Sequence, residues 1–298
     1  MAALQTANIV GVAGTPPTGL ITYLTAGAYL DAEGAPRDGR RACIVEPFTS
    51  ATIVDSLKGL FMPQEAIAEQ YRKGLMGRDS AGTNWKLDQN VVSQTFGSYS
   101  GNTLSADTTA QVGYLSTGWS QYSTIQIKAS SSSTLNAGDV IQIAGVYATN
   151  PQNRQPYGTN KLRSFVVKSA VSVASGASVS VIVSPAVISG GQFQNVSIPV
   201  PAASAAVTFF ASQYNASGNG VVSPQNIVMH RNAFTMAMAD LELPEGVHFA
   251  GRASDKEIGL SMRVVRQYTI NNDSIPTRVD VLYGWAPLYP ELACRVAA

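Results

Sequence analysis

Apolar positions in the first third of the chain recur at helical spacing, then at strand spacing, then at helical spacing again. Between Pro17 and Pro36 they follow one face of a 3.6-residue repeat, which predicts a helix. Arg41 to Pro47 is a short apolar run between turn residues, which predicts a buried strand. Two further helices are predicted, one over the apolar positions from Ile53 to Phe61 and one between Pro63 and Gly74. The apolar face of the first helix consists of Leu20, Tyr23, Leu24, Ala28 and Tyr29.

From residue 97 to 222 the pattern changes to short runs with a period of two, such as STIQIKAS, DVIQIAGV and SVSVIV. These runs are rich in β-branched residues and are separated by Ser, Gly, Asn and Pro, which is typical of a small antiparallel barrel or sandwich. Low-complexity Ser/Val sequence is the alternative, but the Gly-Asp, Asn-Pro and Gly-Gly turns favour a folded domain. The charged residues here are sparse: Asp107, Lys128, Asp139, Arg154, Lys161, Arg163 and Lys168.

After Pro224 the mixed character returns. A short strand is predicted to run into a helix that ends near Asp240. Two alternating runs, Leu260–Ile270 and Val279–Trp285, flank an Asn-Asn-Asp-Ser turn and predict a hairpin with one buried face. A last extended piece is predicted from the alternation of Leu292, Cys294 and Val296.

These patterns predict three segments: 1–96 as the first part of an α/β core, 97–222 as an inserted β-barrel, and 223–298 as the second part of the core. Insertion at a surface loop is the tolerated way to add such a module to a domain.

Composition narrows the class of protein. Of the 298 residues, 45% are hydrophobic and only 13% are charged, about half the usual fraction of roughly 25%. Low charge suits a surface that other copies of the protein cover. A net charge of +1 argues against a dedicated nucleic-acid binder. The first basic residue is Arg37 and no apolar run reaches 18 residues, which disfavours a signal peptide and a membrane span.

Candidate chemistry is sparse. Phosphate-loop, nucleophile-elbow, zinc and EF-hand motifs are missing, and no Asp or Glu lies between Asp139 and Asp240. His230 is expected to satisfy a backbone group at a strand end and His248 to be a partly buried loop residue. Cys43 and Cys294 are expected to be reduced and buried, although a thiol hydrolase using one of them with a histidine stays open. No catalytic, cofactor or metal residue is predicted. The aromatic residues of the barrel region are better suited to its core than to sugar binding: Tyr114, Trp119, Tyr122, Tyr147 and Tyr157.

Charged residues crowd the closing segment of a chain that is otherwise poor in charge. Such a concentration favours specific ion-pair contacts with other subunits, and solvated faces are the alternative. The candidate intersubunit residues are Arg263, Arg266, Arg278, Asp280, Glu291 and Arg295.

The closing sequence IGLSMRVVRQYTI, followed by TRVDVLYGWAPLYPELACRV, resembles the C-terminus of the major capsid (coat) proteins of tailed bacteriophages, especially short-tailed Salmonella phages. The stretches AYLDAEGAPRDGRRACIVEP, LFMPQEAIAEQYRKGLMGR and NIVMHRNAFTMAMADLELP are similar too, in the same order. The resemblance implies an α+β chain with the capsid fold of tailed phages and herpesviruses, its axial (A) and peripheral (P) domains interrupted by a small β-barrel.

The resemblance also implies function and partners. Family members form the hexamers and pentamers of icosahedral shells, guided by a scaffolding protein and joined to a portal, and the shells enclose double-stranded DNA held non-specifically. The expected location is the virion, after assembly in the host bacterial cytoplasm, with no cofactor and no membrane. MAALQTANIVGV is similar to the end of the family's spine helix, so the resemblance implies a prophage-encoded or truncated form without the N-terminal arm, the E-loop and most of that helix. A carbohydrate-binding phage adhesin is the alternative function.

Overall fold

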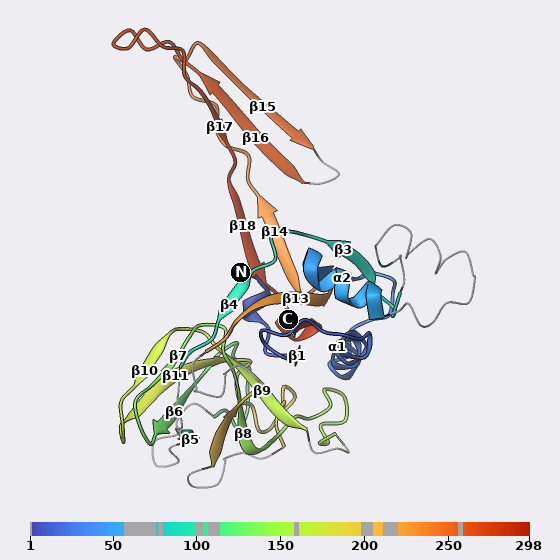
Figure 1. The fold of residues 1–298 in the computed structure, drawn as a ribbon. Helices are drawn as coiled ribbons and strands as arrows, with labels where there is room; N and C mark the ends of the chain where they lie inside the picture. The colour runs from blue at the N-terminus through green and yellow to red at the C-terminus, as the bar shows by residue number, and fades with distance from the viewer. Residues whose placement is uncertain are drawn as a thin grey trace, which may run out of the picture. The chain divides into compact units, whose positions relative to one another are not determined.

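The computed structural model describes residues 2–56, 76, 80–98, 104–106, 114–157, 161–197, 205–210, 220–255 and 259–298. The chain forms two compact units (Figure 1). Unit 1 comprises Met1–Ala233 and Tyr289–Ala298, and unit 2 comprises Phe234–Leu288. Each unit is described by itself.

Unit 1 is built on a mixed sheet that joins strands from both ends of the chain. Its order is β1-β19-β13-β2-β3, and β4 also pairs with β13. The β1–β19 and β2–β3 pairs are parallel, whereas β13 is antiparallel to its neighbours. The strands are β1 (Ile9–Gly11), β2 (Arg41–Val45), β3 (Asn84–Leu87), β4 (Ser93–Thr95), β13 (Val222–His230) and β19 (Ala293–Ala297).

Two helices, α1 (Ile21–Ala32) and α2 (Pro47–Ser56), pack against one face of this sheet. Leu30 of α1 and Ile53 of α2 are fully buried in one apolar cluster with residues of β2, β13 and β19. Helix α1 ends because Gly34 adopts a φ of 77° and the Ala35 amide donates to the Leu30 carbonyl at 2.9 Å. The predicted helix before Pro36 and the predicted strand at Arg41 are therefore confirmed. Helix α2 begins earlier than Ile53, and the predictions from residue 57 to 75 lie outside the described residues.

The end of a helix predicted over the first twelve residues is wrong for residues 2–12, which form no α-helix. A short 3₁₀ helix, η1 (Ala2–Gln5), is followed directly by strand β1. The Thr6 hydroxyl donates to the carbonyls of Pro290 and Ala293, at 2.7 and 2.8 Å. Parallel pairing with β19 provides hydrogen-bond partners for the backbone groups of β1, so this segment is extended and not helical.

The middle of the chain forms a closed antiparallel barrel with the strand order β11-β6-β5-β12-β8-β9 (Figure 1). Alternate residues of β6 are buried, including Ile125 and Ile127, while Lys128 faces solvent. The inward side chains form one core around Phe165, which confirms the predicted small antiparallel barrel. Its strands are β5 (Leu104–Ala106), β6 (Ser123–Ala129), β8 (Val140–Tyr147), β9 (Leu162–Val167), β11 (Ser178–Ser184) and β12 (Ala206–Phe209); β7 (Ser133–Leu135) and β10 (Val171–Val173) form a separate pair.

Unit 2 consists of strands. β14 (Phe234–Met238) pairs with β18 (Tyr283–Pro287), so the helix predicted to end near Asp240 is wrong. Every residue of β14 has a cross-strand partner in β18, and this pairing outweighs the helical spacing of the apolar residues in the segment. β15 (Phe249–Asp255), β16 (Leu260–Arg266) and β17 (Thr277–Asp280) form an antiparallel sheet, seen side by side in Figure 1.

The predicted hairpin is present, but the face predicted to be buried is exposed to solvent. Met262 is 47% exposed and Val279 57% exposed, because no second layer of described residues in unit 2 packs against this sheet. The second predicted strand is also broken, since β17 pairs with β16 while β18 pairs with β14. After a short 3₁₀ helix, η3 (Pro290–Leu292), β19 confirms the last extended piece.

The stability of the barrel is expected to depend on the buried side chains of its core. Substitutions at one buried and one exposed phenylalanine test this. Phe165→Ala removes a fully buried ring and is expected to lower the free energy of unfolding by about 3–5 kcal/mol. Phe193→Ala, at a ring that is 43% exposed, should cost less than about 1 kcal/mol. Urea unfolding followed by circular dichroism measures both, and equal losses would contradict the barrel core described here.

Candidate functional site

Three of the six candidate contact residues form one cluster in unit 2. Asp280 accepts hydrogen bonds from Arg263 (Nη2–Oδ2, 2.5 Å) and from Arg278 (Nε–Oδ1, 2.6 Å). Arg263 also donates to the Glu242 carbonyl at 2.5 Å. The hydrogen bond from Arg278, and then that from Arg263, lowers the pKa of Asp280. The carboxylate is therefore already engaged, whereas the Arg278 side chain is 73% exposed and accessible to other molecules.

The other three candidates lie in different environments. Arg266, at the end of β16, is exposed. Glu291 belongs to unit 1 and is half-buried, and its carbonyl accepts from the Asn8 amide at 3.1 Å. Arg295 is fully buried inside unit 1, so it does not lie on a surface that another subunit can reach. The six residues thus do not form one site.

Arg295 instead connects the sheet of unit 1 to the barrel. Its Nη2 donates to the Gly138 carbonyl at 2.8 Å, while Nε and Nη1 have no hydrogen-bond partner among the described residues. Nearby, the fully buried Asp139 accepts from the amides of Asn136 and Gly97, at 2.8 and 3.1 Å. Burial raises the pKa of Asp139 to about 6 and lowers that of Arg295 to about 10.

A second buried contact joins α1 to the barrel. Arg163 of β9 and Glu33 at the end of α1 form an ion pair at 2.5 Å, with side chains only 6% and 10% exposed. The Tyr157 hydroxyl donates to the Ala32 carbonyl at 2.5 Å. Burial, with a smaller contribution from Glu291, raises the pKa of Glu33, and the Arg163 charge opposes this shift. Both contacts hold the barrel against the core of unit 1.

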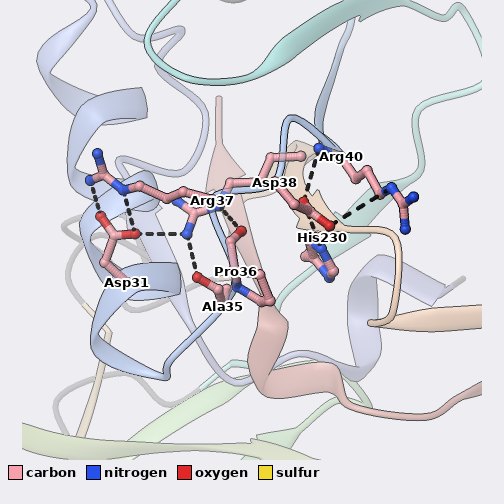
Figure 2. Close-up of polar contacts among 8 residues, drawn as sticks. Asp31, Ala35, Pro36, Arg37, Asp38, Arg40 and His230 are labelled. Carbon is pink, nitrogen blue, oxygen red and sulfur yellow. Dashed lines mark hydrogen bonds and ion pairs between the residues drawn. The ribbon is translucent and has the colours of Figure 1, made fainter.

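The connection between α1 and β2 is held by arginines and aspartates (Figure 2). Arg41, which is 5% exposed, donates from Nη2 to Asp31 at 2.7 Å and to the Ala35 carbonyl at 2.6 Å. Arg37 forms an ion pair with the same carboxylate, and its hydrogen bond is the main reason that the pKa of Asp31 is lowered. These acceptors are occupied by structural contacts, which fixes the loop rather than creating an active site.

The two histidines differ. His230, at the end of β13, is 1% exposed and lies 3.2 Å from Asp38, as Figure 2 shows. Its Nδ1 accepts from the Asn232 backbone amide at 3.3 Å, and its Nε2 faces Asp38. The predicted backbone role of His230 is confirmed. His248 is exposed and not partly buried, because no described layer covers its bend.

Neither cysteine is suited to nucleophilic catalysis. Cys43 and Cys294 are free and fully buried in the apolar core of unit 1. Burial raises the pKa of both thiols, which suppresses the thiolate. Among the described contacts, neither thiol is bonded to a histidine. The described residues also hold no group of three or more metal-ligating side chains, and none of their helices is long and apolar enough to cross a membrane.

The buried ion pair of Glu33 with Arg163 and the buried Asp139 were not predicted as functional. Asp139 and Arg163 are among the few charged residues of the barrel segment, and a charged residue in such a segment is often buried and paired, which was the available signal. Glu33, the partner of Arg163, and Gly97, which donates to Asp139, are remote in sequence, so only the fold identifies them.

Comparison with known proteins identifies one family model and several solved structures, one of which is described here. A family model described as "P22 coat protein - gene protein 5" matches residues 2–295. Among solved structures, the "CUS-3 coat protein I-domain" is 25% identical, with 38% of this chain and 97% of that chain covered and a TM-score of 0.24. The search of curated proteins gives no match.

Acid should stabilise the chain through Asp139. Since its pKa is about 6 in the folded state and 3.8 in the reference state, the folded chain binds a proton that the unfolded chain does not bind between these values. This contribution to stability is fully present below pH 3.8 and is lost as the pH rises through 6. Relative to Asp139→Asn, the wild-type chain is expected to gain up to about 3 kcal/mol from pH 7 to pH 4. Urea unfolding of both proteins across this range measures the difference, and a constant difference would contradict a buried, titrating Asp139.

Both thiols should be protected in the folded chain. Ellman's reagent is expected to label neither Cys43 nor Cys294 under native conditions and both in denaturant, because each side chain is 0% exposed. Rapid native labelling of either thiol would support the thiol-hydrolase alternative instead.

Proposed function

The chain belongs to the P22 coat protein family, and we propose that it assembles with copies of itself into the hexamers and pentamers of an icosahedral bacteriophage shell around double-stranded DNA. Family membership makes it a structural capsid protein and a component of the virion. Scaffolding protein, portal and non-specifically held DNA are its proposed partners, and the host cytoplasm is the proposed place of assembly. The carbohydrate-binding alternative is not favoured, because the family match spans the barrel and both flanking segments.

The observation that carries self-assembly is the exposed apolar surface of unit 2. None of the buried hydrophobic side chains among the described residues lies in unit 2, although more than half of the exposed large ones do. An isolated protein rarely leaves so much apolar surface to water, and such surfaces mark protein contacts. The largest exposed fractions are those of Ile270, Tyr283, Leu288, Val279 and Met236.

We further propose that the two core segments, 1–96 and 223–298, form the A and P domains and that 97–222 is the inserted domain. Adjacency of β2 and β13 in one sheet supports this, since the barrel lies between them in the sequence. A coat subunit needs no active site, because closed symmetry multiplies several modest interfaces into a stable shell.

Among the candidate contact residues, Arg278 is best placed for an intersubunit role, because its side chain is exposed. Asp280, which also binds Arg263, holds the Arg278 side chain in position. Arg266 is exposed on the neighbouring strand. Long-range attraction between such charges and a neighbouring copy would set the register of the contact. Arg295 is excluded by its burial and Glu291 contributes at most its half-exposed side chain.

Sedimentation velocity combined with negative-stain electron microscopy tests the proposed function. The purified chain should form shells, rings or sheets as its concentration rises. A monomer at every concentration up to the solubility limit would contradict self-assembly.

A charge reversal tests the role of Arg278. Arg278→Glu removes an exposed positive charge and places a second carboxylate beside that of Asp280. The protein concentration needed for assembly should therefore rise about tenfold, which corresponds to a loss of about 1.4 kcal/mol of binding free energy per contact. Arg154→Glu, at an exposed position of the barrel segment, is the matched control and should leave this concentration unchanged. Equal assembly of both variants, with unchanged circular dichroism, would rule out a contact at Arg278.

A further inference from the structure

A loop of unit 1 concentrates positive charge on a chain that is nearly neutral. The connection between α1 and β2 contains Arg37 and Arg40, and Arg41 follows as the first residue of β2. Arg231, just after β13, lies beside this connection, because its backbone amide donates to the Arg40 carbonyl at 3.3 Å. Residues 36–41 together with Arg231 are called the arginine loop below.

The carboxylates of this region do not balance its arginines. Asp31 accepts hydrogen bonds from both Arg37 and Arg41. Asp38 is the carboxylate that Arg40 contacts in the described part of the chain. Four arginines against two aspartates leave two positive charges in excess, whereas the whole chain has a net charge of only +1. The arginine loop is therefore a local positive patch.

Three of the four guanidinium groups are accessible to other molecules. The side chains of Arg37 and Arg40 are 77% and 61% exposed, and they extend to opposite sides of the loop in Figure 2. The ion pair of Arg40 with Asp38 is long, at 3.8 Å. Arg231 is exposed, and its side chain has no partner among the described residues. The remaining N–H donors of these groups are available to a ligand that carries many acceptor oxygens.

The backbone that carries these side chains is fixed by contacts within unit 1. The buried Arg41 donates from Nε to the Pro36 carbonyl at 3.0 Å. The Asn84 side chain of β3 donates to the Gly39 carbonyl, also at 3.0 Å. Because the loop is held in one conformation before binding, a ligand that contacts its arginines does not have to order the backbone.

We propose that the arginine loop is a contact site for the phosphate backbone of double-stranded DNA. This inference rests on the proposed function, in which DNA is a partner of the shell. Phosphate oxygens accept paired hydrogen bonds from guanidinium groups, and such contacts carry no sequence information.

The spacing of charge on DNA favours this partner over the acidic surface of a neighbouring subunit. Duplex DNA carries one negative charge about every 1.7 Å along its axis, so arginines that extend in different directions can each meet a phosphate. A protein partner would need a carboxylate placed individually opposite each arginine.

Fluorescence anisotropy with a short labelled duplex, measured on the complete chain at several salt concentrations, tests the site. The protein concentration is kept below that at which the chain assembles. Arg40→Gln and Arg231→Gln each remove one exposed charge and leave the buried contacts of Arg41 in place. Arg154→Gln, at an exposed arginine of the barrel segment, is the matched control.

Each of the two loop variants is expected to weaken binding to all duplex sequences by the same factor. Each should also reduce the slope of log affinity against log salt concentration by about one, because one phosphate contact is lost. Arg154→Gln should bind like the wild-type chain. No salt-dependent binding by the wild-type chain, or an unchanged slope in both loop variants, would overturn the proposal.

Competition identifies the source of the negative charge. At constant ionic strength, unlabelled duplex should displace the labelled duplex, whereas inorganic phosphate and poly-glutamate should not. Displacement by inorganic phosphate would reveal a site for the free ion, and displacement by poly-glutamate as effective as that by DNA would reveal a site for acidic proteins. Either result would overturn the proposal.

Sedimentation velocity on the same proteins separates this inference from the proposed self-assembly. Arg40→Gln and Arg231→Gln should assemble like the wild-type chain, which would show that their loss of DNA binding is not a loss of folding. A wild-type chain that assembles but does not bind DNA would contradict the DNA contact alone. A wild-type chain that binds DNA through the arginine loop but never assembles would contradict self-assembly alone.

Discussion

The architecture of unit 1 depends on backbone pairing by the last strand of the chain. Strand β19 lies between β1 and β13, so the beginning and the end of the chain meet in the middle of one sheet. All five of its residues are buried. On one face Cys294 and Val296 pack under the helices, and on the other Arg295 reaches the barrel at Gly138. Because a buried strand must pair its backbone groups, β19 holds β1 and β13 beside it and so joins the two ends of the chain.

The inserted barrel depends on the same constraint. It leaves the sheet after β4 and returns at β13, two strands that pair with each other, so its two connections lie close together. A module attached in this way needs further contacts to hold its orientation, and the buried ion pair of Glu33 with Arg163 supplies one. Removing one partner of such a pair leaves an uncompensated buried charge, so the loss of either residue would strongly destabilise the junction.

Features of local origin were predictable from the sequence. The barrel follows from alternation in runs such as Ser123–Ala129, and α1 follows from its apolar face and the Gly34 stop. Strand β14 was predicted as a helix because its partner β18 is about fifty residues away and short-range spacing does not record it. The exposed face around Met262 and Val279 was predicted as buried, since alternation shows which side chains share a face but not what covers that face.

Unit 2 has the features of a surface that is completed by assembly. Its sheet carries large apolar side chains in water, and its charges form a fixed cluster around Asp280 from which Arg278 extends. Unit 1, in contrast, has its own apolar cores and its own buried ionic contacts. We therefore propose that unit 1 forms the folded core of this coat protein and that unit 2 makes the contacts with neighbouring subunits.

Hydrogen–deuterium exchange of the assembled particle and of the free chain, compared segment by segment, tests the central claim most directly. The account predicts that β15, β16 and β17 exchange rapidly in the free chain and become strongly protected on assembly, whereas the barrel core around Phe165 is protected in both states. Assembled particles in which unit 2 exchanges as fast as in the free chain would contradict the claim that its exposed surface is the one that neighbouring subunits cover.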